Sequence, residues 1–388
     1  MLGLGVNAHT SVTLGLFGLP LVMPDIQRDF QVSLPVAAVI GNAPGIGILF
    51  ALVAWGALAD RRGERLVLAI GVGLASVFFA AAAFAQAPWA VVTLLALAGA
   101  AGSAAMVGGG RIVLRWFDPP ERGVAMGLRQ VSYTLGMALA GFLLPAVSGA
   151  YGLPGVLLVC SGFCLVAAIL AGLLLAEPPR GLAAGSARQA ASPYRGSELW
   201  RVHGTSALHV VPQIVVSTYG VACLVGVYGW DKVHAGQLFG AAAIGGAVVR
   251  IAAGRWSDRT GLRMGPLRII TVTTAAVMAL LVVAQVSSGV TALAWAGPVT
   301  LALAAVITVA GNGLAYLAAG ELAGPGWAGR VLGTHNGIQN IVALVSAPLL
   351  GVLIAQAGFW AGFSAGLVLC LASLPVIPVG GERGRRAS

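Results

Sequence analysis

The chain of 388 residues is 58% hydrophobic and 9% charged, with a mean hydropathy of +0.93 and a formal net charge of +10. Soluble domains carry about 25% charged residues, and a core this apolar would leave too little polar surface to cover itself in water. The composition therefore excludes an ordinary soluble protein and predicts a membrane protein. Nucleic acid is not the expected partner, because the basic residues, nearly all of them Arg, recur at intervals between apolar runs instead of gathering on one face or tail.

Twelve apolar stretches are long enough to cross a bilayer, whose hydrocarbon core of about 30 Å requires roughly 20 apolar residues in a helix. They begin near residues 7, 36, 66, 89, 122, 152, 205, 234, 266, 291, 330 and 359. The N-terminal stretch lacks the basic segment of a cleaved signal peptide, so we interpret it as the first span. The predicted fold is an all-α membrane protein with twelve transmembrane helices.

Arginine placement predicts how these spans are oriented. With the N-terminus in the cytoplasm, 20 of the 22 basic residues fall in cytoplasmic segments, and only Arg28 and Lys232 fall outside. Such a bias fixes orientation because basic loops remain on the cytoplasmic side. We therefore expect a multi-pass protein of the inner (plasma) membrane with both termini in the cytoplasm.

Two stretches of the first half return in the second half. The charged segment GALADRRGERLVL (56–68), between spans two and three, returns as GRWSDRTGLR (254–263) between spans eight and nine. A second pair, RGVAMGLRQVSYTLG (122–136) and AGRVLGTHNGIQNIV (328–342), aligns at an offset of 206 residues. Two parallel six-span repeats are an architecture of transporters.

The repeat also predicts the domains. We expect two pseudo-symmetric six-helix bundles over 1–176 and 205–380, a cytoplasmic linker over 177–204 and a cytoplasmic tail over 381–388.

With these features the sequence resembles the major facilitator superfamily. The resemblance rests on the motif Gly56, Leu58, Asp60, Arg61, Gly63 and Arg65, and on its weaker echo Gly254, Ser257, Asp258, Arg259, Gly261 and Arg263. The stretch RWFDPPERGVAMGLRQ after span four is similar to the bacterial anion and monocarboxylate branches of that superfamily. The resemblance implies alternating access, in which two halves rock around a central site.

The resemblance also implies a cytoplasmic gate. Asp60 would meet the start of span eleven, near Arg330 and Gly333, because the positive end of a helix stabilises a carboxylate by roughly 0.3–1 kcal/mol. Asp258 would meet the start of span five, near Arg122 and Arg129. The expected gate residues are Gly56, Asp60, Arg61, Gly63, Arg65, Arg250, Gly254, Asp258, Arg259 and Arg263. The alternative is that both motifs only mark cytoplasmic loops.

Polar residues at membrane depth are the candidates for binding a substrate, since they are costly there unless they face a cavity or each other. The candidates are Asn42, Arg129, Tyr133, Thr134, Gln213, His335, Asn336, Gln339 and Asn340. Hydrogen bonds between helices are the alternative role for the amides. For Arg129 we favour pairing with Asp258 over a counter-charge for an anionic substrate. Asn42 could instead satisfy backbone groups freed by Pro44.

The remaining observations restrict the activity. No phosphate-binding loop, metal-ligand spacing or catalytic pairing occurs, so we expect neither an enzyme nor a cofactor. All twelve acidic residues fall in loops or at span ends, unlike in proton-coupled exporters of cations. We expect a monomeric secondary transporter, antiporter or uniporter, for a small organic anion, with a coupling proton or counter-substrate. The alternatives are an exporter of amphiphilic drug-like compounds and a non-transporting sensor on the same fold.

Overall fold

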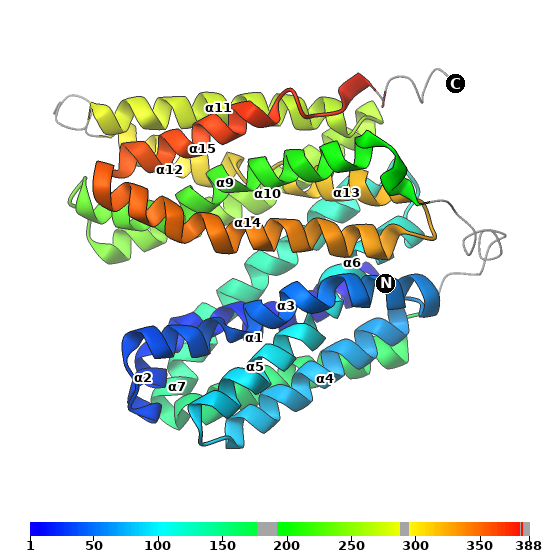
Figure 1. Cartoon of the computed structure of the whole chain (residues 1–388), viewed down its shortest axis with the longest axis vertical. Coiled ribbons are helices and arrows are strands. Elements are labelled where there is room, and N and C mark those ends of the chain that lie inside the picture. The colour runs from blue at the N-terminus through cyan, green and yellow to red at the C-terminus, as the bar shows by residue number, and fades with distance from the viewer. Residues whose placement is uncertain (177–191, 288–294, 381, 383–388) are drawn as a thin grey trace. The chain divides into compact units, whose positions relative to one another are not determined.

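The computed structural model describes the whole chain apart from residues 177–191, 288–294, 381 and 383–388, and what it describes is helical (Figure 1). The first half contains α1 (Leu2–Gly18), η1 (Leu19–Val22), α2 (Met23–Phe30), α3 (Leu34–Arg62), α4 (Glu64–Phe84), α5 (Pro88–Gly102), α6 (Ala104–Trp116) and α7 (Arg122–Leu174). The second half contains η2 (Pro193–Arg195), α9 (Ser197–Gly226), α10 (Lys232–Thr260), α11 (Met264–Val286), α12 (Ala296–Ile307), α13 (Asn312–Ala323), α14 (Ala328–Ala357) and α15 (Phe359–Ser373).

Ten helical stretches of the described residues are long and apolar enough to cross a membrane, and α15, with 15 residues, is a shorter apolar helix. The 53 residues of α7 cover the stretch in which the sequence predicts spans five and six. A straight helix of that length would measure about 80 Å, far more than a bilayer. Its backbone breaks at Gly152, where φ is +63°. The count of twelve spans stays a prediction.

Glycines with a positive φ lie at matching places in the two halves. Gly63 (φ +89°) separates α3 from α4, and Gly261 (φ +60°) follows α10 198 residues later. Gly152 interrupts α7, and Gly358 (φ +91°) separates α14 from α15 206 residues later. Side chains other than glycine rarely adopt this backbone conformation. The internal repeat seen in the sequence is therefore also a repeat of chain reversals.

Contacts divide the chain into two compact units, each described by itself. Unit 1 comprises Met1–Asp118, Leu128–Ser192 and Ala323–Gly337, and unit 2 comprises Pro119–Gly127, Pro193–Leu322 and Ile338–Ser388. The first residues of α7 thus belong to unit 2, and the first residues of α14 belong to unit 1. Most of the predicted linker, and the predicted tail apart from Glu382, lie outside the described residues.

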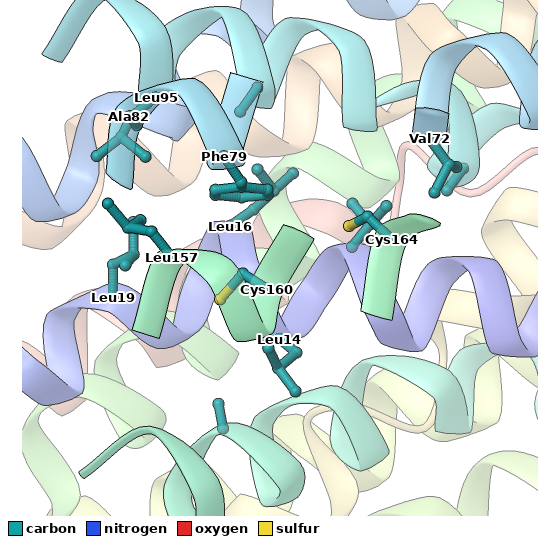
Figure 2. Close-up of a cluster of buried hydrophobic side chains, with 14 of the residues drawn as sticks. Leu14, Leu16, Leu19, Val72, Phe79, Ala82, Leu95, Leu157, Cys160 and Cys164 are labelled. Atoms are coloured by element: carbon teal, nitrogen blue, oxygen red, sulfur yellow. The ribbon is translucent and has the colours of Figure 1, made fainter. Parts of the chain in front are cut away.

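The core of unit 1 is packed closely from small and apolar side chains. Phe79 of α4 is fully buried, and Leu16, Leu157, Cys160 and other apolar side chains of α1, α4 and α7 surround it (Figure 2). A Cβ on Gly15 would lie 2.6 Å from the Phe79 ring, so this approach of α1 requires a glycine. Such small residues let transmembrane helices pack by van der Waals contact.

The core of unit 2 lies among α9, α11 and α15, which run side by side (Figure 1). Its buried side chains include Val215, Met278, Leu281 and Phe363. The four cysteines of the chain are free and buried, and two of them, Cys160 and Cys164, lie in the unit 1 core of Figure 2.

Candidate functional site

Asp60, near the end of α3, lies against the first turn of α14. Its Oδ1 accepts a hydrogen bond from the Gly329 N–H at 2.7 Å, and its Oδ2 accepts one from the Arg330 N–H at 3.1 Å. The first N–H groups of a helix have no acceptor within the helix. The carboxylate therefore caps α14 from another helix, which is the neighbour that the resemblance implied for Asp60. We call Gly56, Asp60, Gly329 and Arg330 the first latch.

The first latch also brings two backbones into direct contact. A Cβ on Gly56 would overlap the carbonyl oxygen of Gly329, and a Cβ on Gly329 would overlap that of Gly56. One turn further along α14, a Cβ on Gly333 would lie 2.5 Å from the Leu52 carbonyl oxygen. Any side chain at these positions would force the helices apart, and the carboxylate of Asp60 would lose its two donors.

Unit 2 contains the same arrangement. The Oδ1 and Oδ2 of Asp258, in α10, accept hydrogen bonds from the N–H groups of Gly123 and Val124 at 2.8 Å each, in the first turn of α7. A Cβ on Gly254 would overlap the carbonyl oxygen of Gly123. A Cβ on Gly127 would lie 2.8 Å from the Arg250 carbonyl oxygen. We call Gly123, Val124, Gly254 and Asp258 the second latch.

A buried charge network supports the first latch. Arg111 of α6 forms ion pairs with Asp60 and, at 2.9 Å from its Nε, with Glu64. Arg115, one turn later in α6, pairs with the other oxygen of Glu64 at 2.7 Å. The side chains of Asp60, Glu64 and Arg111 are only 2%, 3% and 5% exposed. Opposite charges so far from water stabilise the fold only as a complete set, since one left alone would be strongly destabilising.

A different network supports the second latch. Asp258 forms an ion pair with Arg263, whose Nη1 lies 2.7 Å from Oδ1. The pairing of Asp258 with Arg129 that we favoured stays a prediction, because Arg129 belongs to unit 1 and Asp258 to unit 2. Arg263 also pairs with Glu321 of α13 at 3.1 Å, and Arg122 lies 3.6 Å from Glu321. Burial lowers the pKa of Arg263, but Glu321 and Asp258 outweigh this and raise the pKa above its ordinary value. Arg263 is therefore a permanently charged centre of this network.

The other predicted gate residues lie around the latches. Gly63 provides the reversal between α3 and α4, and Arg65 of α4 donates to the Gly172 carbonyl oxygen at 2.8 Å. Arg250 donates to the carbonyl oxygen of Val309 at 3.3 Å. Arg61 and Arg259 are exposed, in keeping with basic residues at the membrane surface.

Arg129, on α7 in unit 1, is a buried cation with 3% exposure. Its guanidinium donates to the Met106 carbonyl oxygen of α6 and, at 2.7 Å, to Oε1 of Gln130. Beside it the Ser132 hydroxyl lies 2.5 Å from Nδ1 of His9 in α1. Polar groups of α1, α6 and α7 thus converge around Arg129.

The other candidates of unit 1 differ in their surroundings. Tyr133 is 40% exposed, and its ring meets Phe17 edge to face at 5.4 Å. His335 is buried, whereas Thr134 and Asn336 are half-buried. Asn42 is exposed and donates to the Ala38 carbonyl oxygen at 2.9 Å. Pro44 lacks the N–H that would bond to the carbonyl oxygen of Ile40, four residues earlier. The bond from Asn42 goes to Ala38 and therefore does not satisfy the Ile40 carbonyl oxygen.

In unit 2 two amide candidates bond to other helices. Gln213 of α9 accepts a hydrogen bond from Asn312 of α13 at 2.7 Å. Gln339 of α14 donates to the Ser206 hydroxyl of α9 at 2.6 Å. Asn340, next to Gln339, is half-buried. The sequence left two roles open for these amides, to line a cavity or to form hydrogen bonds between helices, and these bonds are of the second kind.

Sequence reasoning missed Glu64, Glu321 and Glu382 as functional residues. The spacing of the first network contained a signal, because Asp60 and Glu64 are four residues apart, as are Arg111 and Arg115. Arg111 and Arg115 share one face of α6, because side chains four apart in a helix lie on the same side. Asp60 and Glu64 flank the break at Gly63, so two acids at one helix junction are matched by two arginines on one helix face. In the described part of the chain, no three His, Cys, Asp or Glu side chains lie close enough together to hold a metal ion.

The chain has many helices of membrane length, glycine reversals at matching places in its two halves, and two contacts in which an aspartate caps the start of another helix. These features define a multi-pass membrane protein built from a repeated unit. The family model of the Major Facilitator Superfamily matches residues 7–347. The chain is 36% identical over 383 residues to an uncharacterized MFS-type transporter of Mycobacterium tuberculosis, and the match covers 98% of this chain and 84% of that protein. The chain therefore belongs to the Major Facilitator Superfamily.

Two further similarities are more distant. The gallate transporter of Pseudomonas putida is 28% identical over 186 residues, 48% of this chain and 41% of that protein. The crystal structure of the human organic anion transporter TETRAN superposes with a TM-score of 0.76 at 16% identity, over 96% of this chain and 98% of that one. The second likeness shows the shared fold alone.

Proposed function

We propose that this protein is a secondary transporter that carries a small organic anion across the inner membrane by alternating access. The proposal includes two six-helix halves and cytoplasmic termini. The Major Facilitator Superfamily membership supports transport, and the Mycobacterium tuberculosis and Pseudomonas putida relatives are named as transporters.

The observation that carries the choice of substrate is the buried guanidinium of Arg129. A cation at membrane depth is costly, and such residues are usually functional. A guanidinium can hold a carboxylate by two parallel hydrogen bonds. The acidic residues of the chain lie in loops or at span ends, so the middle of the membrane carries fixed positive charge and favours an anion. That a relative is named as a gallate transporter supports the same choice.

The two latches supply the gate of this mechanism. Each places a carboxylate on the N-terminal amides of a helix, an interaction worth roughly 0.3–1 kcal/mol at a surface and up to about 2 kcal/mol where partly buried. Two such contacts hold the cytoplasmic end closed by an amount that substrate binding can offset. A ligand shifts the equilibrium only by its difference in affinity for the two states, so weak, paired contacts suit a carrier better than a strong lock.

The substrate class can be tested by thermal stability of the purified protein with two ligand panels, small carboxylates and amphiphilic cations. A ligand at about 100 times its Kd should stabilise the fold by roughly 2.7 kcal/mol. We expect stabilisation by carboxylates, lost in Arg129→Gln and retained in the control Arg28→Gln, whose side chain is 61% exposed. Stabilisation by the cations, unaffected by Arg129→Gln, would contradict the proposal and favour the drug exporter.

A further inference from the structure

Glu382, close to the C-terminus, lies against the start of α11. Its carboxylate accepts hydrogen bonds from three successive backbone N–H groups, those of Arg263, Met264 (2.9 Å) and Gly265 (3.4 Å). The residue before α11 offers no side-chain cap of its own. Since the first amides of a helix need an outside acceptor, a residue almost 120 positions later in the chain completes this helix.

The segment leading to Glu382 is also anchored at its other end. After α15 the chain runs through Leu374–Gly380, and Arg201 of α9 holds three of its carbonyl oxygens. The guanidinium donates to the carbonyl oxygens of Pro375 at 3.1 Å, Val376 at 3.0 Å and Ile377 at 3.4 Å. We call residues 374–380 together with Glu382 the strap.

The tip of the strap contacts the residue on which the second latch depends. The backbone of Arg263 donates to Glu382, while its side chain, 7% exposed, pairs with Asp258 and Glu321 and donates to the Pro119 carbonyl oxygen at 2.7 Å. Asp258 in turn holds the amides of the first turn of α7. A continuous series of bonds therefore runs from the strap to the second latch.

The strap also forms a wall of a cavity beside the latch. The cavity measures about 940 Å³, and its lining includes Pro378 and Glu382 of the strap as well as Arg122, Asp258, Arg263 and Glu321. Water that enters this space competes for these charges, because a cavity of this size lined by charged side chains has room for many water molecules. Fixing the backbone at Arg263 keeps its guanidinium directed at Asp258 and Glu321.

The first latch is built without such a strap in the part of the chain that the structure describes. There the first residue of α4 is itself acidic, and this residue, Glu64, pairs with Arg111 and Arg115. The supporting charges of the first latch thus come from regular helices, whereas Arg263 lies in the turn between α10 and α11.

We propose that the strap is a regulatory element that reinforces the second latch and leaves the first latch unaffected. The inference rests on the gating role proposed above. When Glu382 leaves the start of α11, the turn that carries Arg263 loosens, Asp258 loses part of its support and the second latch opens more often. A change at the C-terminus thereby alters only one of the two gate contacts.

Amide hydrogen exchange, resolved to single residues, tests this in the full-length purified protein. The amides of 263–265, of 123–124 and of 329–330 depend on Glu382, Asp258 and Asp60 as acceptors, respectively. In Glu382→Gln we expect exchange about tenfold faster at 263–265 and a smaller acceleration at 123–124, because amides without acceptors exchange as at a frayed helix end. The amides of 329–330 should be unchanged. Arg201→Gln, which releases the other end of the strap, should act in the same direction more weakly.

The control is Asp118→Asn, which removes one exposed carboxylate and should change none of the three sites. Unchanged exchange at 263–265 in both strap variants would overturn the proposal. Acceleration at 263–265 without any at 123–124, or equal acceleration at 329–330, would overturn it as well. These readings need no substrate, so their failure leaves the proposed transport untouched. The gating role of the latches would be contradicted only if substitutions of Asp60 and Asp258 left turnover unchanged.

Discussion

In the first latch, acids at the junction of α3 and α4 face arginines of α6, whereas in the second latch an arginine between α10 and α11 faces an acid of α13. Arg115 and Glu321 occupy corresponding positions, 206 residues apart, yet they carry opposite charges. Their partners, Glu64 and Arg263, are reversed as well. The capping carboxylates and the crossing glycines, by contrast, are the same in both units.

This difference separates the residues that the close contact of two helices requires from the charged residues that only support it. Two backbones in contact tolerate only glycine, and two N–H groups at a helix start are both satisfied by the two oxygens of one carboxylate. These requirements fix the residue types at three positions of each latch, namely two glycines and one aspartate. The surrounding charges need only be paired, because a buried ion pair is stable whichever of the two segments supplies the acid. Removing one partner is costly, since the other then stays buried and unpaired. Either polarity therefore serves.

The largest expected effect comes from removing the central arginine of each network. Arg111→Met leaves Asp60 and Glu64 buried without their shared cation, which should destabilise the fold by about 3–5 kcal/mol. Arg263→Met should cost less, because Glu321 is 24% exposed and still has Arg122 nearby. Thermal unfolding in one detergent ranks the two, with the exposed Arg61→Met as control. Equal losses would show that depth of burial does not distinguish the networks.

Backbone contact gives the next largest effect. Gly56→Ala inserts a Cβ into the Gly329 carbonyl oxygen and should destabilise by about 1–3 kcal/mol, as overpacking does. Gly45→Ala is the matched control in the same helix, where a Cβ would meet nothing within 4 Å. Alanine there should be neutral or favourable by up to about 1 kcal/mol. If both variants unfold at the same temperature, the first latch is not a contact of the protein in detergent.

These latches also show how far sequence reasoning reaches. Asp60 could be assigned to the start of span eleven through the resemblance to the Major Facilitator Superfamily, and the second copy of the motif indicated Asp258 as its counterpart. The supporting charges were not predictable, because Arg111 is 47 residues from Glu64 and only the packing of α6 beside α4 brings them together. The partner of Arg129 could not be assigned, because depth along a helix does not fix the direction of a side chain.

The smallest effect on stability, and the more informative one on function, is expected for Asp60→Asn, because Arg111 keeps its ion pair with Glu64. The amide keeps one acceptor oxygen but turns an N–H toward the Arg330 N–H, so one bond and the charge are lost. We expect turnover in proteoliposomes to fall about two- to fivefold, the change in population that 0.3–1 kcal/mol produces, with substrate affinity retained. Normal turnover would remove Asp60 from the gate.

The accessibility of α14 beside the first latch reports whether Asp60 holds this helix against α3. Val331 follows the two capped residues and is fully buried, and the native cysteines are buried too, so Val331→Cys gives a single reporter with little background. We would measure its reaction with a maleimide in the purified protein, with and without Asp60→Asn, against Gln86→Cys, in the loop between α4 and α5, as an exposed reference. If Asp60 holds the gate, labelling is slow and accelerates in the Asp60→Asn background. Labelling that is fast from the outset, or equally slow in both backgrounds, would contradict a gate held by this carboxylate.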